Sequence, residues 1–152
     1  MREKDCKIIS VLFVLFILDL IKPFNYSLRA EFLFLGIIFL SLNYRFWFSF
    51  VLSIIFGYLK DSFGLEAIPL NLIEFSLFSA LIHYFLLHFH KIPVRIFIVF
   101  AAIIIHIVLQ AAHIRRIFPL FSLLFFIHSS LIFFLINYLL KKWIRISSAE
   151  YI

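Results

Sequence analysis

The residues of this chain that could do chemistry are a few ionisable side chains close to, or inside, long apolar segments. Gly57 stands four residues before Asp61 at the end of one apolar segment, and Glu74 lies about two turns inside the next. A carboxyl group in an apolar medium must be protonated, be paired, or face a polar cavity. Each of these carboxyl groups is therefore a candidate for a functional site or for a contact that joins two segments.

Glu74 has Asn71 one turn before it, and Lys60 and Asp61 precede it across a short connection that contains Gly64 and Pro69. This spacing leaves two interpretations open. Glu74 either makes a structural contact with Lys60 across the connection, or it belongs to a functional site.

His106, Gln110 and His113 are spaced by four and then three residues, which places them on one stripe of a helix. In a membrane such a stripe faces other helices, and we expect interhelical hydrogen bonds from it. Metal binding by these histidines together with His128 is the less favoured alternative, because zinc usually requires a third or fourth strong ligand and a fixed second shell. We expect no metal or other cofactor.

Four further charged residues flank the first connection between apolar segments. Asp19 and Lys22 are three residues apart, which predicts an ion pair at the level of the lipid headgroups. Arg29 and Glu31 open the next segment, where the dipole of a helix N-terminus favours an acidic residue. We interpret these residues as structural.

The composition assigns the chain to the membrane proteins. Of its 152 residues, 65% are hydrophobic and 14% are charged, and 23 are phenylalanine; the mean hydropathy is +1.14. Soluble domains have roughly 25% charged residues, and a domain this small buries only about two thirds of its surface. The net charge of +6 then indicates a cytoplasmic membrane face rather than nucleic acid. Cys6, the only cysteine, forms no intrachain disulfide.

Six apolar segments predict an all-α membrane bundle that forms one domain over residues 1–152. They cover residues 8–22, 30–43, 46–61, 67–88, 93–113 and 118–140. A full span takes about 20 residues, so the first three are short, and a re-entrant hairpin over residues 30–61 is the alternative to two full spans. The apolar run that starts at residue 8 lacks a small-residue cleavage site, so we expect a retained first span. No internal repeat is recognisable.

The distribution of lysine and arginine predicts that both termini lie in the cytoplasm. In a six-span arrangement of that kind, nine of the 14 basic residues fall in the inside segments and five in the outside segments, mostly because the two termini are basic.

The sequence carries no signature of a known catalytic site. The zinc-protease motif His-Glu-x-x-His, the serine-hydrolase motif Gly-x-Ser-x-Gly, the phosphate loop and the dinucleotide fingerprint are all missing. The chain has only three glycines, too few for a glycine-built phosphate cradle. We therefore expect a protein without catalytic activity.

Several of these motifs together resemble the MreD family of bacterial rod-shape-determining membrane proteins. Gly57-x-x-x-Asp61, a loop with Gly64, and Pro69-Leu70-Asn71 are similar to the family's Gly-x-x-x-Asp, small-residue loop and Leu-Gly-x-Asn. The run from Arg29 to Leu33 is similar to the family's Arg-Pro-Asp/Asn-x-Leu. Pro69 stands where the family usually has Gly, and Ala30 where it often has Pro. The chain length and the basic tail also agree with the family.

The resemblance implies a non-catalytic subunit of the cell-elongation machinery in the bacterial cytoplasmic membrane. The partner would be an MreC-like protein, within a complex that includes an MreB-like actin homologue, a RodA-type glycosyltransferase and a class B penicillin-binding transpeptidase. The alternative is the substrate-binding membrane subunit of an energy-coupling-factor vitamin transporter. Such subunits are also small, basic and six-span, but of their Ala-x-x-x-Ala-like docking surfaces only Ser76-x-x-x-Ala80 is approximated here.

The Gly57–Asp61 motif yields a specific structural hypothesis. Gly57 offers no side chain, so a neighbouring helix could approach closely at that turn. Asp61, one turn later on the same face, would accept hydrogen bonds from residues 62–71 or from the start of the next span. These contacts would fix the angle between the two spans, and with it the surface shown to a partner; a solvated Asp61 at headgroup level is the alternative.

Overall fold

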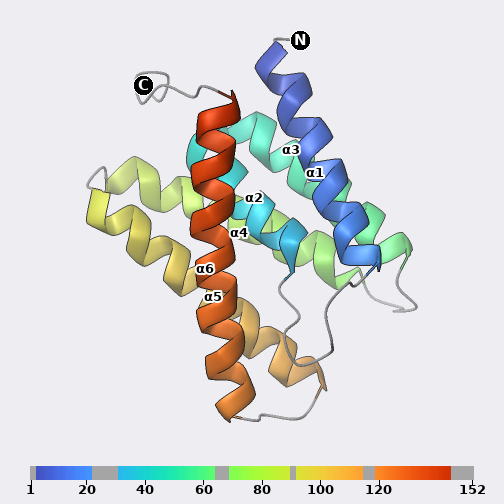
Figure 1. The fold of residues 1–152 in the computed structure, drawn as a ribbon, viewed down its shortest axis with the longest axis vertical. Coiled ribbons are helices and arrows are strands. Elements are labelled where there is room, and N and C mark those ends of the chain that lie inside the picture. Colours follow the sequence, from blue (N-terminus) through green and yellow to red (C-terminus); the bar gives the residue numbers. More distant parts are fainter. Residues whose placement is uncertain (1–2, 22–30, 64–68, 90–91, 115–118, 145–152) are drawn as a thin grey trace.

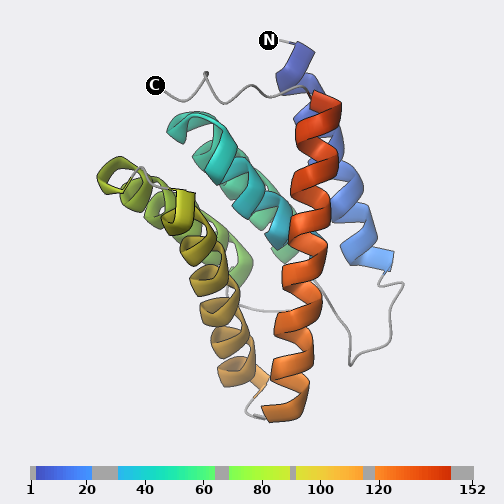
Figure 2. The same cartoon turned by 60° about the vertical axis from the view of Figure 1, so that its left-hand side comes forward.

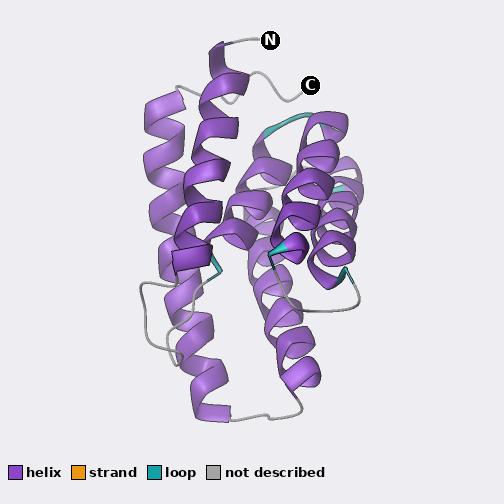
Figure 3. Ribbon diagram, turned by 90° about the vertical axis from the view of Figure 1, so that its right-hand side faces the viewer, coloured by secondary structure: helices purple, strands orange, loops and turns teal. Residues whose placement is uncertain are grey.

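The computed structural model describes residues 3–21, 31–63, 69–89, 92–114 and 119–144, with side chains in the last two ranges described over 93–109 and 122–144. The described residues form six α-helices and no strand, which confirms the predicted all-α class (Figures 1 and 3). The helices are α1 Glu3–Ile21, α2 Phe32–Asn43, α3 Phe46–Ser62, α4 Leu70–His88, α5 Ile92–Ile114 and α6 Pro119–Ile144.

The helices follow the six predicted segments in order, but two of them extend four or more residues further than predicted. α1 begins at Glu3 rather than residue 8, and α6 ends at Ile144 rather than residue 140. Hydropathy detects only the apolar part of a helix, whereas polar turns can continue it. In α1 the ion pair between Glu3 and Lys7 (2.6 Å) supports the extra turn, and its hydrogen bond and charge lower the pKa of Glu3.

α2 is the central helix of the bundle. It has 12 residues, and every residue from Leu33 to Asn43 is buried. A helix that is apolar all round lies either in a protein core or in a membrane, and the burial of these residues shows that other helices enclose α2. Its length of about 18 Å is well short of the roughly 30 Å of a bilayer's hydrocarbon core. This short enclosed helix is joined to a longer one, α3, by Tyr44 and Arg45. The two-span and the re-entrant interpretations of residues 30–61 both stay predictions.

Phenylalanine side chains form much of the contact between α2 and α4. The ring of Phe34 lies 5.2 Å from that of Phe78 and 6.1 Å from that of Phe75, and the first pair is edge-on. Such geometry suits the charge distribution of aromatic rings. All three side chains are buried, so they hold α4 against the central helix.

α5 and α6 form a pair that extends past the other four helices. Figures 1 and 3 show the end of α5 and the start of α6 reaching beyond α1–α4, while the start of α1 and the end of α6 lie at the same opposite end of the molecule. Figure 2 shows α4 and α5 diverging from their joined ends. Among the described residues two helical stretches, Leu70–His88 and Ser122–Ile144, are long and apolar enough to cross a membrane.

Candidate functional site

Asp61 at the end of α3 caps the start of α4. Its Oδ1 accepts hydrogen bonds from the Asn71 backbone amide (3.0 Å) and side-chain amide (2.7 Å), and its Oδ2 accepts one from the Leu72 amide (2.8 Å). The first amides of a helix have no partner within the helix, and its N-terminus favours a negative charge. The residue in the N-cap position, Pro69, makes no side-chain cap of its own. Asp61 supplies that cap from the neighbouring helix.

Gly57 lies where α3 and α4 approach most closely around this cap. A Cβ atom at Gly57 would lie 2.6 Å from the Cα of Leu72 and 2.9 Å from the carbonyl oxygen of Asn71. Both are backbone atoms, so they cannot move aside without shifting α4. The hydrogen bonds that we expected for Asp61, and the close approach that we expected at Gly57, are both present in the structure.

Asp19 makes the same arrangement one helical pair earlier. Its Oδ1 accepts a hydrogen bond from the Phe32 amide (2.8 Å) and its Oδ2 one from the Leu33 amide (3.1 Å). The end of α1 therefore caps the start of α2 just as the end of α3 caps the start of α4. The side chain of Asp19 is only 8% exposed, and its ion pair with Lys22 stays a prediction. Lys22, the expected partner, lies outside the described residues, as does Arg29.

Glu31 stands at the N-cap position of α2 but does not cap it. Its side chain forms an ion pair with Lys60 of α3, and the Lys60 ammonium also lies 3.8 Å from Asp19. The same ammonium sits 5.4 Å from the centre of the Phe75 ring. The prediction that the helix dipole holds Glu31 was incomplete, because Asp19 already occupies the amides at the start of α2. Lys60 thus joins α3 to α1 and to the start of α2.

Glu74 pairs with His106 rather than with Lys60. Its Oε1 lies 2.5 Å from His106 Nδ1, while His106 Nε2 lies 3.6 Å from Glu31. Lys60 is already held by two other carboxylates, so the predicted contact between Glu74 and Lys60 is replaced. His106 is 1% exposed, and its ring stacks on Phe34 at 4.0 Å between centres.

The histidine stripe predicted on α5 is described only in part. His106 faces the bundle, as the spacing predicted. Gln110 and His113 belong to α5, but their side chains lie outside the described part of the structure. In that described part no group of three or more histidine, cysteine or carboxylate side chains could hold a metal ion.

These side chains form one network, which we call the interhelical cluster and define by its members Asp19, Glu31, Lys60, Glu74 and His106. It draws one residue each from α1, the start of α2, α3, α4 and α5. The three carboxylates contact an ammonium, an imidazole and backbone amides, which offset the cost of removing them from water. The arrangement can therefore hold five segments in register, and Asp61 adds a separate contact between α3 and α4.

A further polar contact, around His83, was not foreseen. Its Nε2 lies 3.1 Å from the carbonyl oxygen of Tyr44 and 3.3 Å from Ser49 Oγ, and its Nδ1 lies 2.9 Å from the Ser79 carbonyl oxygen. His83 thereby ties α4 to the turn between α2 and α3. The serines of α3 and α4 could have indicated this contact. Ser49, Ser53 and Ser79 are fully buried small residues that allow close helix contact.

No protein-family model, no curated protein and no solved structure matches this chain. The residues and their contacts are therefore the basis for assigning a function.

Proposed function

We propose that this chain is a non-catalytic, multi-pass membrane subunit of the bacterial cell-elongation complex, where it organises peptidoglycan synthesis together with an MreC-like partner. The contact between α3 and α4 carries the proposal. Gly57, Asp61 and Asn71 bear the resemblance to the MreD family, and they are the residues that fix α3 against α4. A motif that fixes the angle between two helices also fixes the surface that these helices present to a partner protein, which is what an organising subunit requires.

Placement in the bacterial cytoplasmic membrane is supported by the exposed surface. Many large apolar side chains point outward, among them Leu87, Trp47 and Phe97, each more than 70% exposed. Monomeric soluble proteins rarely expose apolar surface on this scale. Two helical stretches have the length and composition of spans. We propose six membrane-associated helices with both termini in the cytoplasm, which agrees with the basic residues at the two ends.

A role without catalysis is supported by how the carboxylates are used. Asp19 and Asp61 accept hydrogen bonds from helix amides, Glu31 pairs with Lys60, and Glu74 pairs with His106. A catalytic carboxylate has to reach a substrate proton or a reacting atom, whereas these four are engaged by the protein itself.

Affinity purification of the tagged full-length chain from membranes of its own cell, followed by mass spectrometry, tests the proposal. We expect an MreC-like protein as the main partner, with RodA-type glycosyltransferase, class B penicillin-binding transpeptidase and MreB-like protein at lower yield. The same purification with the variant Asp61→Ala should recover less of the MreC-like protein. Recovery of a pair of ATPases with a coupling subunit would contradict the proposal and identify a transporter.

A further inference from the structure

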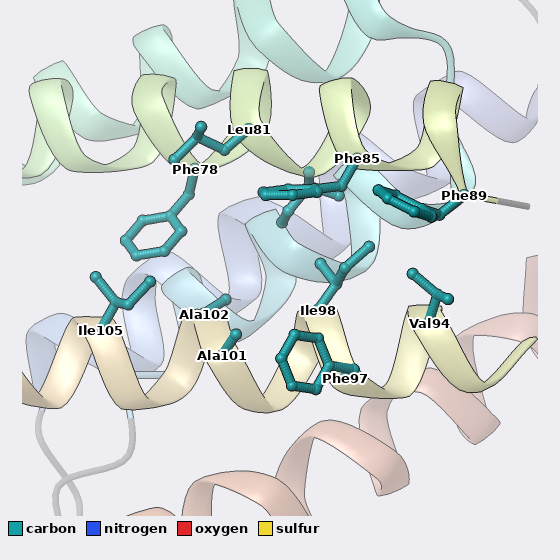
Figure 4. A pocket seen from close by; sticks show the side chains of 11 residues that line it. Phe78, Leu81, Phe85, Phe89, Val94, Phe97, Ile98, Ala101, Ala102 and Ile105 are labelled. Atoms are coloured by element: carbon teal, nitrogen blue, oxygen red, sulfur yellow. The ribbon is translucent and has the colours of Figure 1, made fainter.

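A groove runs along the diverging pair α4 and α5. Its volume is about 440 Å³, and the eleven side chains that line it are all hydrocarbon (Figure 4). Phe85 and Phe97 stand at its sides, and Ala101 and Ala102 leave its α5 wall low. Pockets for polar small molecules place a few hydrogen-bonding groups among apolar ones. This groove has none, so its ligand is recognised by hydrocarbon contact.

The groove is long enough for one extended hydrocarbon chain. The lining residues on α5 run from Val94 to Ile105, which is about 16 Å at the rise of an α-helix. An extended acyl chain can lie along this length and contact hydrocarbon side chains throughout.

Positive charge lies at one end of this groove. Arg95 directly follows Val94, the lining residue at the end where α4 and α5 are joined. Lys141, in the last turn of α6, is close enough to Arg95 for the two charges to interact. In the proposed orientation this end faces the cytoplasmic leaflet, where anionic lipid headgroups are concentrated.

We propose that the groove between α4 and α5 binds one acyl chain of an anionic phospholipid, whose headgroup lies at Arg95 and Lys141. The inference rests on the membrane placement proposed above, because only a bilayer supplies such a chain. Burial of the methylene groups favours lipid binding, and the phosphate adds a charge contact at the cytoplasmic end. The lipid would fill the space that separates α5 from α4.

The test is native mass spectrometry of the full-length chain released from nanodiscs of phosphatidylglycerol and phosphatidylcholine in equal amounts. We expect one retained phosphatidylglycerol per chain. Ala101→Trp and Ile105→Trp fill the groove from its wall and from its rim, and each should reduce retention roughly tenfold, the equivalent of losing about two methylene contacts. Leu131→Trp, on an exposed position of α6 away from the groove, is the matched control and should retain lipid as the wild type does.

Arg95→Gln separates the headgroup from the acyl chain: retention should persist while the preference for phosphatidylglycerol is lost. Melting temperatures of all variants, measured in the same detergent, identify any variant that fails to fold. A wild type without retained phospholipid, an isoprenoid lipid as the retained species, or equal loss in Leu131→Trp would each overturn the inference. The measurement uses the purified chain alone, so a missing MreC-like partner would refute the proposed function and leave this result unaffected.

Discussion

At the scale of single residues, the structure distinguishes carboxylates that cap helices from carboxylates that pair with cations. Asp19 and Asp61 each use both oxygens on two consecutive backbone amides. Glu31 and Glu74 instead contact Lys60 and His106. The first kind fixes the start of a helix, and the second kind fixes distances between helices.

Removal of the Asp61 carboxylate should destabilise the protein, because the start of α4 loses its cap. In Asp61→Ala the amides of Asn71 and Leu72 lose their acceptor, and we expect a loss of about 1–3 kcal/mol in the free energy of unfolding. Thermal unfolding in detergent measures this loss. Glu3→Ala is the control, since Glu3 is exposed and its pair with Lys7 is a surface pair of small effect. Equal melting temperatures for the two variants would mean that Asp61 is solvated.

The pairing of Glu74 can be tested with double-mutant cycles. The cycle of Glu74→Gln with His106→Gln should give a coupling energy within about 0.5–3 kcal/mol, because these side chains are in contact and buried. The parallel cycle of Glu74→Gln with Lys60→Met should give a clearly smaller value, since Lys60 pairs with Glu31 instead. Chemical unfolding of the purified chain supplies both values. A larger coupling energy in the cycle with Lys60 would mean that Glu74 pairs with Lys60, the contact that the sequence suggested.

At the scale of helices, the sequence was most informative where contacts are local. The partners of Asp61 lie only 10 and 11 residues away across one short connection, so the motif and its neighbours were enough to predict them. The pairs Glu31–Lys60 and Glu74–His106 span 29 and 32 residues. Those pairs depend on how α1–α2, α3–α4 and α5 pack together, which hydropathy does not encode.

The repeated capping arrangement illustrates the same limit. Asp19 and Asp61 occupy equivalent positions at the ends of α1 and α3, but the residues around them share no recognisable pattern. Only the geometry of backbone amides reveals the equivalence, because a carboxylate needs no particular side chain at the start of the helix that it caps.

Two glycines test the packing of helix pairs. A Cβ at Gly57 meets backbone atoms of α4, whereas a Cβ at Gly36 meets the ends of the Leu15 and Leu12 side chains, which can rotate away. Alanine also favours a helix over glycine by about 1 kcal/mol. We expect Gly57→Ala to lower the unfolding free energy by about 1–3 kcal/mol and Gly36→Ala to have a much smaller effect. Thermal unfolding of the two variants side by side decides the matter; a larger loss in Gly36→Ala would contradict the close approach at Gly57.

At the scale of the whole molecule, the start of α1 and the end of α6 lie at the same end of the bundle (Figure 1). The six-span arrangement that we propose requires this, because an even number of crossings returns the chain to the side from which it started. In that proposed placement, the central position of the short α2 means that not every helix has to contact lipid along its full length.

Reporter fusions test the proposed orientation. A reporter that is active only in the periplasm should give activity when fused after residue 27 and none when fused after residue 152, because the basic ends are retained in the cytoplasm. A second reporter, active only in the cytoplasm, should give the opposite pattern at both sites. Periplasmic activity at residue 152 would exclude the six-span arrangement.

The capping arrangement also has a consequence for how the protein is made. α2 and α4 obtain their N-terminal caps from the helix synthesised immediately before them, so each pair is completed as soon as its second helix emerges from the ribosome. In the proposed membrane placement, insertion should then proceed by hairpins, α1 with α2 and α3 with α4, each with its aspartate already hydrogen-bonded to backbone amides. Nascent chains arrested just after α3 should remain accessible to protease at α3, whereas chains arrested beyond α4 should be protected. The order of the helices along the chain therefore also determines the order in which they assemble.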